Sequence, residues 1–446
     1  MKRSFLILFF LAVSNLALAQ FTITGKVLNA ADNKPLENAT VFLNKTNYGA
    51  KTDQQGNFTI SNVPPGHYEL VVSMMSFKVY NVALAVKADT KVPTVIMEEK
   101  STSLNEVKIT VAKKVESKYM EMFKRELLGT SKFGRQCHIL NPKVIQLNFD
   151  PKENKLTAYT SDFMVIENKA LGYRLKYLLE DFERNEKTEL ISYVGYVLFE
   201  TMEGNEQQRQ EWNENRLEAY TGSLQHFLRS VLGNNINKEG ESGFVVATDT
   251  RSPNMSRLAD TLIKEKIRLY SGKYSKIDKD SLFFWTSMFQ QPRYIEVVDT
   301  TKLIAKEIAQ LTDQNGLYAL RINNDINYIK KWIYIKVPGK KGSISFTCDT
   351  CEFKNSLYVT YIKNIPARLG NGYKMPSPRF KESFTPSPEL DKMASLISIY
   401  DGHVLFDWNG VVVNPMSLKV ERYWATQRLG DLLPIDYMPT TESYAK

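Results

Sequence analysis

Three side chains in one short stretch could do chemistry together: Ser223, His226 and Arg229 in TGSLQHFLRS. If this stretch is helical, spacings of three place all of them near one face. A serine beside a histidine can act as nucleophile and base, and an arginine can hold an anion. The same pattern fits a structural role, in which Ser223 caps the helix, His226 packs and Arg229 pairs at the surface. We favour the structural interpretation, so the sequence assigns no catalytic residue.

The histidines give no sign of a metal centre. Only four occur, His67, His138, His226 and His403, and no two have the H-x-H or H-x-x-x-H spacing of metal ligands. The chain also lacks G-x-S-x-G, P-loop and G-x-G-x-x-G motifs. We therefore expect neither a bound metal nor a cofactor.

Two further patterns keep a hydrolase of cell-wall or glycan substrates open as an alternative function. The acidic run Glu180-Asp181-Phe182-Glu183 could supply the paired carboxylates that glycoside hydrolysis uses. The aromatic run Phe283-Phe284-Trp285 could stack on sugar rings. Acidic runs are usually solvated and aromatic runs usually pack in a core, and we favour these simpler interpretations for both.

Cys348 and Cys351 flank Asp349-Thr350 between two strand-like segments, SISFTC and SLYVTY. If Asp349-Thr350 forms a two-residue turn, the cysteines face each other with Cα atoms about 5.5 Å apart, within disulfide range. An oxidising compartment would favour that bond. We predict a structural disulfide, with free thiols or a redox pair as alternatives, and expect Cys137 to be buried.

The first residues have the pattern of a secretory signal. Lys2 and Arg3 precede the apolar stretch 5–13, and Ala17-Leu18-Ala19 is a typical cleavage site. We expect residues 1–19 to be removed and the chain to be exported. No later apolar run approaches the roughly 20 residues of a membrane helix, so no transmembrane segment is expected after cleavage.

The net charge of +9 falls to +7 when Lys2 and Arg3 are removed. The basic excess is spread along the chain, with a local cluster between Lys264 and Lys279. A solvated surface explains this pattern best, and contact with anionic lipid or cell-wall polymer is the alternative. An exported chain is not expected to bind nucleic acid.

The most regular stretch runs from Thr52 to Val72. Asp53 and Gly56 suit the first and last positions of a turn. Phe58 then begins an alternating apolar pattern typical of a half-buried strand, and a second such strand containing Tyr68 follows the turn at Pro65-Gly66. These residues are therefore expected to have structural roles.

The motifs T-D-x-x-G-x-F-x-I and V-P-P-G-x-Y-x-L-x-V resemble those of the carboxypeptidase regulatory-like domain. The resemblance covers residues 20–99 and implies a small transthyretin-like or Ig-like β-sandwich of the seven-stranded type. In that family the sandwich is a non-catalytic attachment. The resemblance also implies a bacterial envelope, with the protein in the periplasm or associated with the outer membrane.

Residues 100–115 are expected to be a linker, and residues 116–446 a larger domain. Within the linker, Leu104 to Thr110 (LNEVKIT) resembles the stretch that follows this sandwich in TonB-dependent receptors. The larger domain resembles an uncharacterised domain of envelope proteins from Bacteroidota-type bacteria. Its segments predict an α+β domain with mostly antiparallel strands, so the chain as a whole is expected to be mainly β with an α+β part.

Several elements of this domain can be placed. A helix is expected over residues 116–128, and a helical stretch over 205–232 that breaks near Gly222, with Ser223 capping its second part. Residues 327–337 and 342–348 are expected to pair as strands. Residues 395–400 and 403–407 are expected to form a hairpin across Asp401-Gly402.

The first hypothesis is thus a non-enzymatic envelope protein whose sandwich docks onto an envelope protein or a cell-wall or glycan partner, because sheet edges and loops offer binding surface without chemistry. A hydrolase acting through the larger domain is the second. An accessory protein related to TonB-dependent receptors is the third.

Overall fold

The computed structural model describes residues 20–100, 113–186, 190–236, 243–253, 260–272, 276–290, 294–299, 303, 305–312, 317–320, 322, 331–336, 343–348, 354–361, 393–399 and 403–439. The chain divides into two compact units. The first comprises Met1–Thr221 and Thr426–Lys446, and the second comprises Gly222–Ala425. The second unit is therefore inserted into the sequence of the first. The boundaries predicted at residues 99 and 116 stay predictions.

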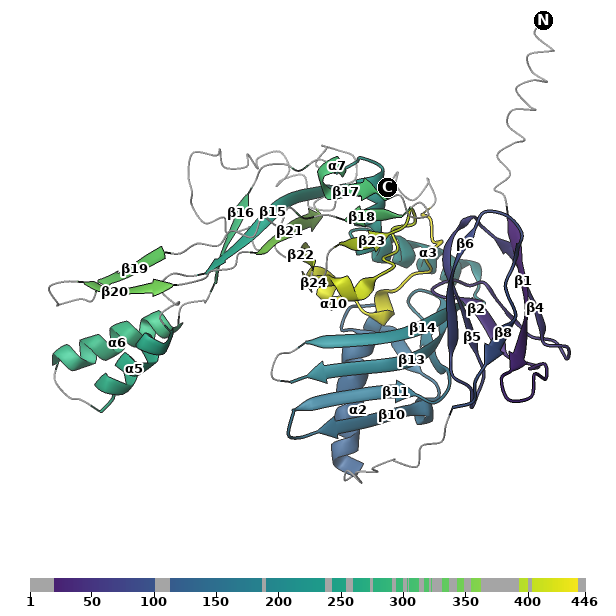
Figure 1. The fold of residues 1–446 in the computed structure, drawn as a ribbon, viewed down its shortest axis with the longest axis horizontal. Coiled ribbons are helices and arrows are strands. Elements are labelled where there is room, and N and C mark those ends of the chain that lie inside the picture. The colour runs from purple at the N-terminus through teal and green to yellow at the C-terminus, as the bar shows by residue number, and fades with distance from the viewer. Residues whose placement is uncertain are drawn as a thin grey trace, which may run out of the picture. The chain divides into compact units, whose positions relative to one another are not determined.

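The first unit begins with a β-sandwich of two four-stranded sheets (Figure 1). One sheet contains β1 (Phe21–Asn29), β4 (Asn57–Val63), β7 (Thr90–Lys91) and β8 (Val95–Met97). The other has the order β3-β2-β5-β6, with β2 (Thr40–Leu43), β3 (Gly49–Lys51), β5 (Gly66–Ser73) and β6 (Tyr80–Val86). The β-sandwich expected at the N-terminus is therefore present.

Alternating burial explains why these residues form a sandwich. In β4, Phe58 and Ile60 are buried while Asn57, Thr59 and Ser61 are exposed, because successive side chains of a strand point to opposite faces. The sandwich has eight strands rather than the expected seven. The difference arises at β1, which pairs in parallel with β7 near its start and with β8 near its end.

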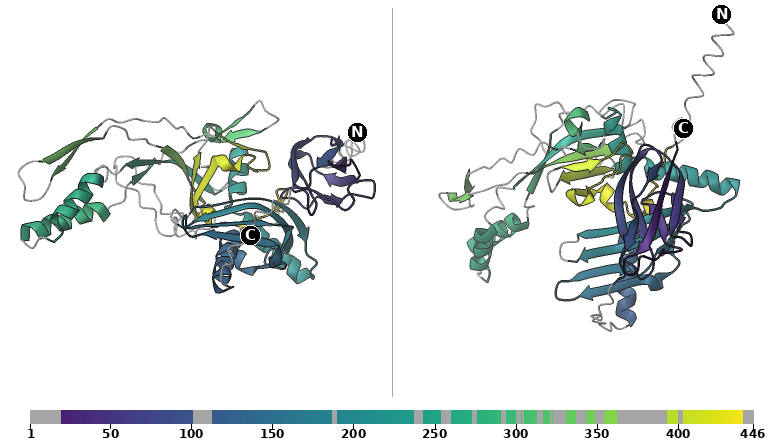
Figure 2. Two further views of the ribbon diagram at one scale, coloured as in Figure 1. Left: turned by 60° about the horizontal axis from the view of Figure 1, so that its bottom comes forward. Right: turned by 45° about the vertical axis from the view of Figure 1, so that its right-hand side comes forward.

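A six-stranded antiparallel sheet follows in the same unit. Its strands are β9 (Cys137–Ile139), β10 (Ile145–Asp150), β11 (Lys155–Thr160), β12 (Met164–Asn168), β13 (Tyr173–Asn185) and β14 (Ile191–Thr201). The order is β10-β11-β13-β12-β9, and β14 pairs with β13. Helix α2 (Lys113–Leu128) covers one face of this sheet (Figures 1 and 2). Phe123 of α2 is fully buried and meets Phe182 edge to face.

Helix α3 (Glu206–Tyr220) follows β14 and completes the sheet-containing part of this unit. The C-terminal residues also belong to it, since Leu429 and Leu433 lie in the same core as Phe123 and Phe182. Short 3-10 turns lie at Gly134–Gln136, Pro142–Val144 and Leu429–Asp431. The core of the first unit therefore contains residues from the C-terminal end of the chain as well as from the segment before the second unit.

The second unit is built around the sheet β16-β15-β21-β22-β24. These strands are β15 (Phe244–Pro253), β16 (Tyr294–Asp299), β21 (Lys354–Tyr361), β22 (Ala394–Ile399) and β24 (Leu418–Arg422). A three-stranded sheet has the order β17 (Ala309–Leu311), β18 (Tyr318–Leu320) and β23 (Val404–Phe406), and β19 (Lys331–Lys336) pairs with β20 (Ser343–Cys348).

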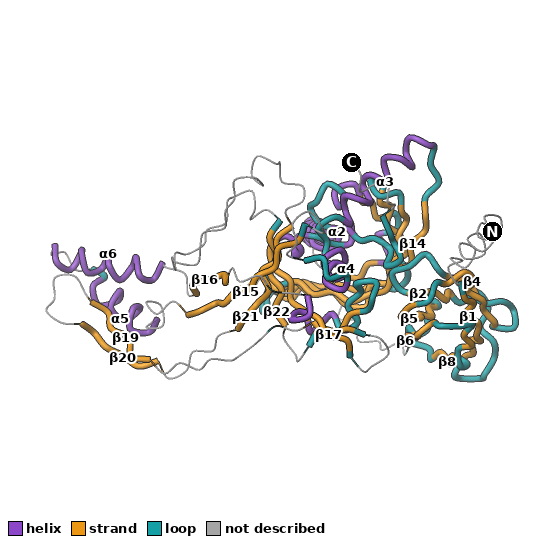
Figure 3. The backbone as a smooth tube through the Cα atoms, turned by 90° about the horizontal axis from the view of Figure 1, so that it is seen from above, coloured by secondary structure: helices purple, strands orange, loops and turns teal. Residues whose placement is uncertain are grey.

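The helices of the second unit are α4 (Leu224–Leu232), α5 (Asp260–Tyr270), α6 (Lys276–Gln290), α7 (Ala305–Ile308) and α10 (Tyr423–Thr426), with a 3-10 turn at Pro415–Ser417. Helices α5 and α6 lie side by side (Figure 3). Helix α4 buries Phe227 against Phe244 of β15 and against Trp424. The whole chain is thus mostly β with some helices, as expected.

Most of the predicted elements that the structure describes are confirmed. The helical stretch breaks between α3 and α4, and Ser223 is the N-cap of α4. Strands β19 and β20 pair antiparallel. The signal peptide at residues 1–19, most of the linker and the Cys348–Cys351 bond lie outside the residues whose placement is described.

The predicted hairpin between residues 395–400 and 403–407 is wrong. Strand β22 lies between β21 and β24, so both of its edges are already paired. Strand β23 instead adds to β18. A local Asp-Gly turn signal such as that at 401–402 does not identify the partners of the strands on either side of it.

Candidate functional site

The three side chains with possible chemistry make structural contacts at the start of α4. The Ser223 hydroxyl accepts a hydrogen bond from the backbone amide of His226 at 3.2 Å. The His226 ring is buried, accepts from the Gly222 amide through Nδ1 at 3.1 Å and packs edge-on against Phe244. Arg229 donates through Nε to the Asn409 carbonyl at 2.8 Å. Ser223 thus caps the helix, His226 packs as a buried ring, and Arg229 holds the loop that contains Asn409.

The predicted structural residues of the sandwich form the turns around β4. The Asp53 carboxylate accepts hydrogen bonds from the amides of Asn57 and Gln55, and the bond from Asn57 contributes most to lowering the pKa of Asp53. Gly56 has a φ of +76°, and a Cβ there would lie 2.5 Å from the Val27 carbonyl oxygen. These contacts explain the T-D-x-x-G pattern without any chemistry.

Beyond β4, Pro65 and Gly66 lie at the turn into β5. Phe58 of β4 is buried in the sandwich core, and the Tyr68 hydroxyl of β5 donates to the Pro64 carbonyl oxygen at 3.0 Å. The second turn is therefore closed by the tyrosine that follows it.

A loop of the sandwich is bound to β14 of the neighbouring sheet. The Asn44 side chain accepts from the Val197 amide at 2.9 Å, and the Lys45 amide donates to the Val197 carbonyl at 2.8 Å. The Phe199 amide donates to the Thr46 carbonyl at 2.8 Å, completing a short parallel bridge. The loop 44–46 thus occupies the edge of β14 as an added strand would. We call this contact the β14 clamp.

Apolar and buried polar contacts strengthen the β14 clamp. Phe42 and Val71 of the sandwich form a small buried cluster with Leu198 of β14. The C-terminal segment joins in, because the Ile435 amide donates to the Lys45 carbonyl at 2.8 Å. Burial, reinforced by the nearby charge of Asp436, raises the pKa of Tyr48 to about 12. The sandwich is therefore held against β14 by backbone hydrogen bonds together with a buried apolar cluster.

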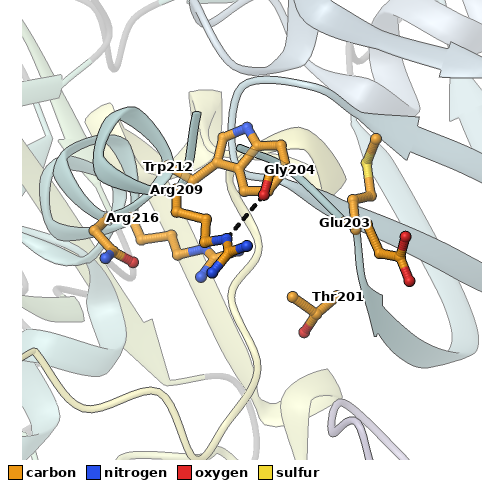
Figure 4. Close-up of a pocket in the computed structure, with 8 residues that line it drawn as sticks. Thr201, Glu203, Gly204, Arg209, Trp212 and Arg216 are labelled. Atoms are coloured by element: carbon orange, nitrogen blue, oxygen red, sulfur yellow. Dashed lines mark hydrogen bonds between the residues drawn. The ribbon is translucent and has the colours of Figure 1, made fainter. Parts of the chain in front are cut away.

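Strand β14 ends at an open cleft of about 810 Å³, here called the α3 cleft (Figure 4). Its walls come from the end of β14, the turn after it and one face of α3. The lining residues are Thr201, Met202, Glu203, Gly204, Arg209, Trp212, Asn213 and Arg216. Residues 209, 212, 213 and 216 share a helix face because they are three, four and seven positions apart.

Trp212 forms a fixed wall of the α3 cleft. Its side chain is only 6% exposed, and its indole N–H donates to the Lys169 carbonyl at 2.9 Å. Two glycines make room for the ring, since a Cβ at Gly172 would lie 2.2 Å from it and a Cβ at Gly204 would lie 2.5 Å from it. The indole therefore fixes the turn before α3 against the turn before β13.

Two arginines extend into the cleft from α3 (Figure 4). Arg209 donates through Nε to the Gly204 carbonyl at 2.8 Å. Arg216 donates to the Leu171 carbonyl at 2.8 Å, and its guanidinium stacks 4.1 Å from the centre of the Tyr173 ring. Burial lowers the pKa of Arg216 from its ordinary value. Such an arrangement of fixed guanidinium groups can bind an anion.

The other predicted patterns lie elsewhere. In the acidic run, Phe182 is buried, Glu183 pairs with Lys155, and burial raises the pKa of Glu180. In the aromatic run, Trp285 is 1% exposed whereas Phe283 is 76% exposed. The expectation of core packing therefore holds for the tryptophan and fails for Phe283.

Two further features are absent from the part of the chain that the structure describes. The described residues contain no group of three or more His, Cys, Asp or Glu that could hold a metal ion. No helix among them is both long and apolar enough to cross a membrane.

Arg209, Trp212 and Arg216 lie in the helical stretch expected over residues 205–232, but none of them was expected to form a site. The signal that was available is the spacing R-x-x-W-x-x-x-R on one helix face. The β14 clamp had no signal in the sequence, because the loop 44–46 and Val197 are about 150 positions apart.

Comparison with known families confirms the resemblance of the N-terminal region. Residues 23–109 match the model of the CarboxypepD_reg-like domain, and the rest of the chain is unassigned. The matched range extends into the LNEVKIT stretch. A search of the curated proteins found no match.

Several solved structures share partial likeness. A cohesin–X-dockerin complex from Acetivibrio cellulolyticus is 24% identical over 18% of this chain and 58% of its own, with a TM-score of 0.17. The present chain thus spans little more than half of that chain. A 5-hydroxyisourate hydrolase from Klebsiella pneumoniae is 18% identical over 18% of this chain and 99% of its own, with a TM-score of 0.15. A minor pilin of Streptococcus agalactiae is 14% identical over 19% and 47%, with a TM-score of 0.17. Likenesses this low carry no conclusion about function.

Proposed function

We propose that this protein is exported to the cell envelope and acts there as a non-enzymatic interaction protein, with the sandwich as its docking module. The β14 clamp carries the proposal. A sandwich held by backbone hydrogen bonds and a buried cluster keeps one orientation on the sheet beside it, so a partner does not have to order it on binding. A fixed module of this kind suits docking better than a loosely tethered spacer.

The docking surface we propose is the free edge of β4. This strand pairs with β1 on one side, and no other described strand pairs with it. Thr59 and Ser61 of β4 are exposed. An exposed edge presents unpaired backbone donors and acceptors, to which an extended segment of a partner can add as a further strand. The partner is accordingly a protein with an extended segment.

The signal sequence predicted at residues 1–19 supports export, and the envelope location remains part of the proposal. The contacts of Ser223 and His226 in α4 give the hydrolase alternative no support, because the hydroxyl caps a helix and the ring Nδ1 is used by a backbone amide. The function is therefore assigned to a surface rather than to a reacting group.

The test is cross-linking of the mature chain in its own envelope, with mass spectrometry of the captured proteins. Thr59→Lys with Ser61→Lys should abolish capture of a defined envelope protein, because lysines on an edge block strand addition. Gln146→Lys with Asn148→Lys is the matched control, since these exposed residues lie on β10, an edge strand of the six-stranded sheet. Equal capture by both variants would refute docking at β4. Release of glycan fragments by the purified chain would support the hydrolase instead.

A further inference from the structure

The α3 cleft contains more hydrogen-bond donors than the protein uses. A guanidinium group has five N–H donors. In Arg209 only Nε has an acceptor among the described residues, the Gly204 carbonyl. In Arg216, Nε and Nη2 donate to the carbonyls of Leu171 and Gly172, and no described acceptor binds Nη1. Terminal donors of both arginines are therefore available to a molecule in the cleft.

The arginines are positioned by carbonyl oxygens instead of carboxylates. Carbonyl oxygens orient a guanidinium but leave its full positive charge uncompensated. Glu203 is the one acidic side chain that lines the cleft, and no ion pair within the described part of the chain joins it to either arginine. In Figure 4 its carboxylate lies on the wall away from the two guanidinium groups. The lining therefore has an excess of positive charge.

Partial burial increases the need for a counter-charge. Arg216 is half-buried between Tyr173 and the cleft, and loss of hydration lowers its pKa. A desolvated charge gains most from a partner that is also hydrogen-bonded to it. A carboxylate or a phosphate meets this need, because two oxygens of either group match the two-pronged donor geometry of arginine.

We propose that the α3 cleft binds an oxyanion group, a carboxylate or a phosphate, on a small ligand. Arg209 and Arg216 hold the oxygens, and the Trp212 ring forms the wall behind them. The volume of about 810 Å³ lies in the range of small-molecule sites, roughly 300–1,000 Å³. This site lies apart from the β4 edge and does not depend on the docking proposal.

Calorimetric titration of the full mature chain with succinate, and separately with inorganic phosphate, tests the proposal at constant ionic strength. At least one probe should bind saturably. Saturation by succinate alone identifies a carboxylate ligand, and saturation by phosphate alone identifies a phosphate ligand. Arg209→Gln should weaken binding at least about tenfold, as expected for loss of a charge-assisted hydrogen bond. The failure of both probes to saturate the wild-type chain would overturn the proposal.

Two further variants separate a built site from a general charge effect. Arg135→Gln removes the same charge from an exposed arginine outside the cleft that also donates to a backbone carbonyl, that of Thr130. It should leave affinity unchanged, and an equal loss in this variant would refute the site. Glu203→Gln should tighten binding about two- to fivefold, because it removes the one negative charge of the lining. A misfolded variant would not gain affinity, and weaker binding by Glu203→Gln would contradict the charge argument.

Discussion

At the residue scale, Gly172 gives the clearest prediction because two separate constraints meet there. Its φ is +66°, and an added Cβ would lie 2.2 Å from the Trp212 ring. Gly172→Ala should lower the free energy of opening of α3 by about 2–4 kcal/mol, combining left-handed backbone strain with overpacking. Hydrogen exchange of the α3 amides measures this change.

Gly272→Ala is the matched control for that substitution. Gly272 has a similar φ of +83°, but no heavy atom of the described residues lies within 4 Å of an added Cβ. Its substitution should therefore lower the free energy of local opening at the end of α5 only by the left-handed backbone strain, about 1–2 kcal/mol. Hydrogen exchange of the amides there measures this change. Equal effects of the two substitutions would mean that Trp212 yields to the new methyl group and does not form a fixed wall.

Cys137 carries a prediction about pH. Burial, assisted by the charge of Asp431, raises the pKa of its thiol from 9.0 to about 12. The unfolded chain therefore loses this proton near pH 9 while the folded chain keeps it, so this contribution to stability is complete below pH 9 and is lost as the pH rises toward 12. At pH 8, iodoacetamide should label Cys137 only after denaturation, as read by mass spectrometry. Rapid labelling of the native chain would contradict the burial argument.

At the element scale, the β14 clamp predicts that one side chain of the sandwich stabilises a strand of the next sheet. Asn44→Ala leaves the buried Val197 amide without its acceptor, which costs about 1–3 kcal/mol. Exchange of the Val197 amide should accelerate accordingly. Thr59→Ala, on the exposed face of β4, should change exchange there by less than about 0.5 kcal/mol. Unchanged exchange in Asn44→Ala would show that the clamp does not hold the sandwich.

Local pattern was sufficient for elements whose neighbours are close in sequence. Alternation around Phe58 placed β4, and Ser223 placed the start of α4, because strand faces and helix caps depend on residues within a few positions. Pairing between distant segments has no such local signal. The residues 395–399 form a strand as expected, yet their partners are β21 and β24 and not the next strand along the chain.

The candidate site was harder to predict than the elements around it. The sequence drew attention to Ser223 and His226 because their types are reactive, whereas Arg209 and Arg216 are common surface residues. What distinguishes the arginines is the set of acceptors near them, the carbonyls of residues 171, 172 and 204. The carbonyl of Gly204 is next to α3 in sequence, but those of residues 171 and 172 come from a turn that only the folded chain brings to α3.

At the scale of the whole molecule, the first unit depends on residues from both ends of the chain. Leu429 is 3% exposed and packs in the core that contains α2 and the six-stranded sheet. Nearby, the Gly430 carbonyl accepts a hydrogen bond from the buried Asn168 side chain at 2.8 Å. Some 200 residues of the second unit separate this segment from the rest of its core. Because of that insertion, the first unit cannot complete its core until the C-terminal segment has been made.

Leu429→Ala should therefore destabilise the first unit selectively. Removal of a buried leucine costs about 2–5 kcal/mol, and hydrogen exchange of the β13 amides should show the loss while β21 of the second unit keeps its protection. Leu190→Ala, at a side chain 58% exposed, should leave both regions within about 0.5 kcal/mol of the parent chain. If β13 kept its protection in Leu429→Ala, the C-terminal segment would be a surface attachment and not part of this core. If β13 and β21 lost protection together, the two units would unfold as one cooperative body.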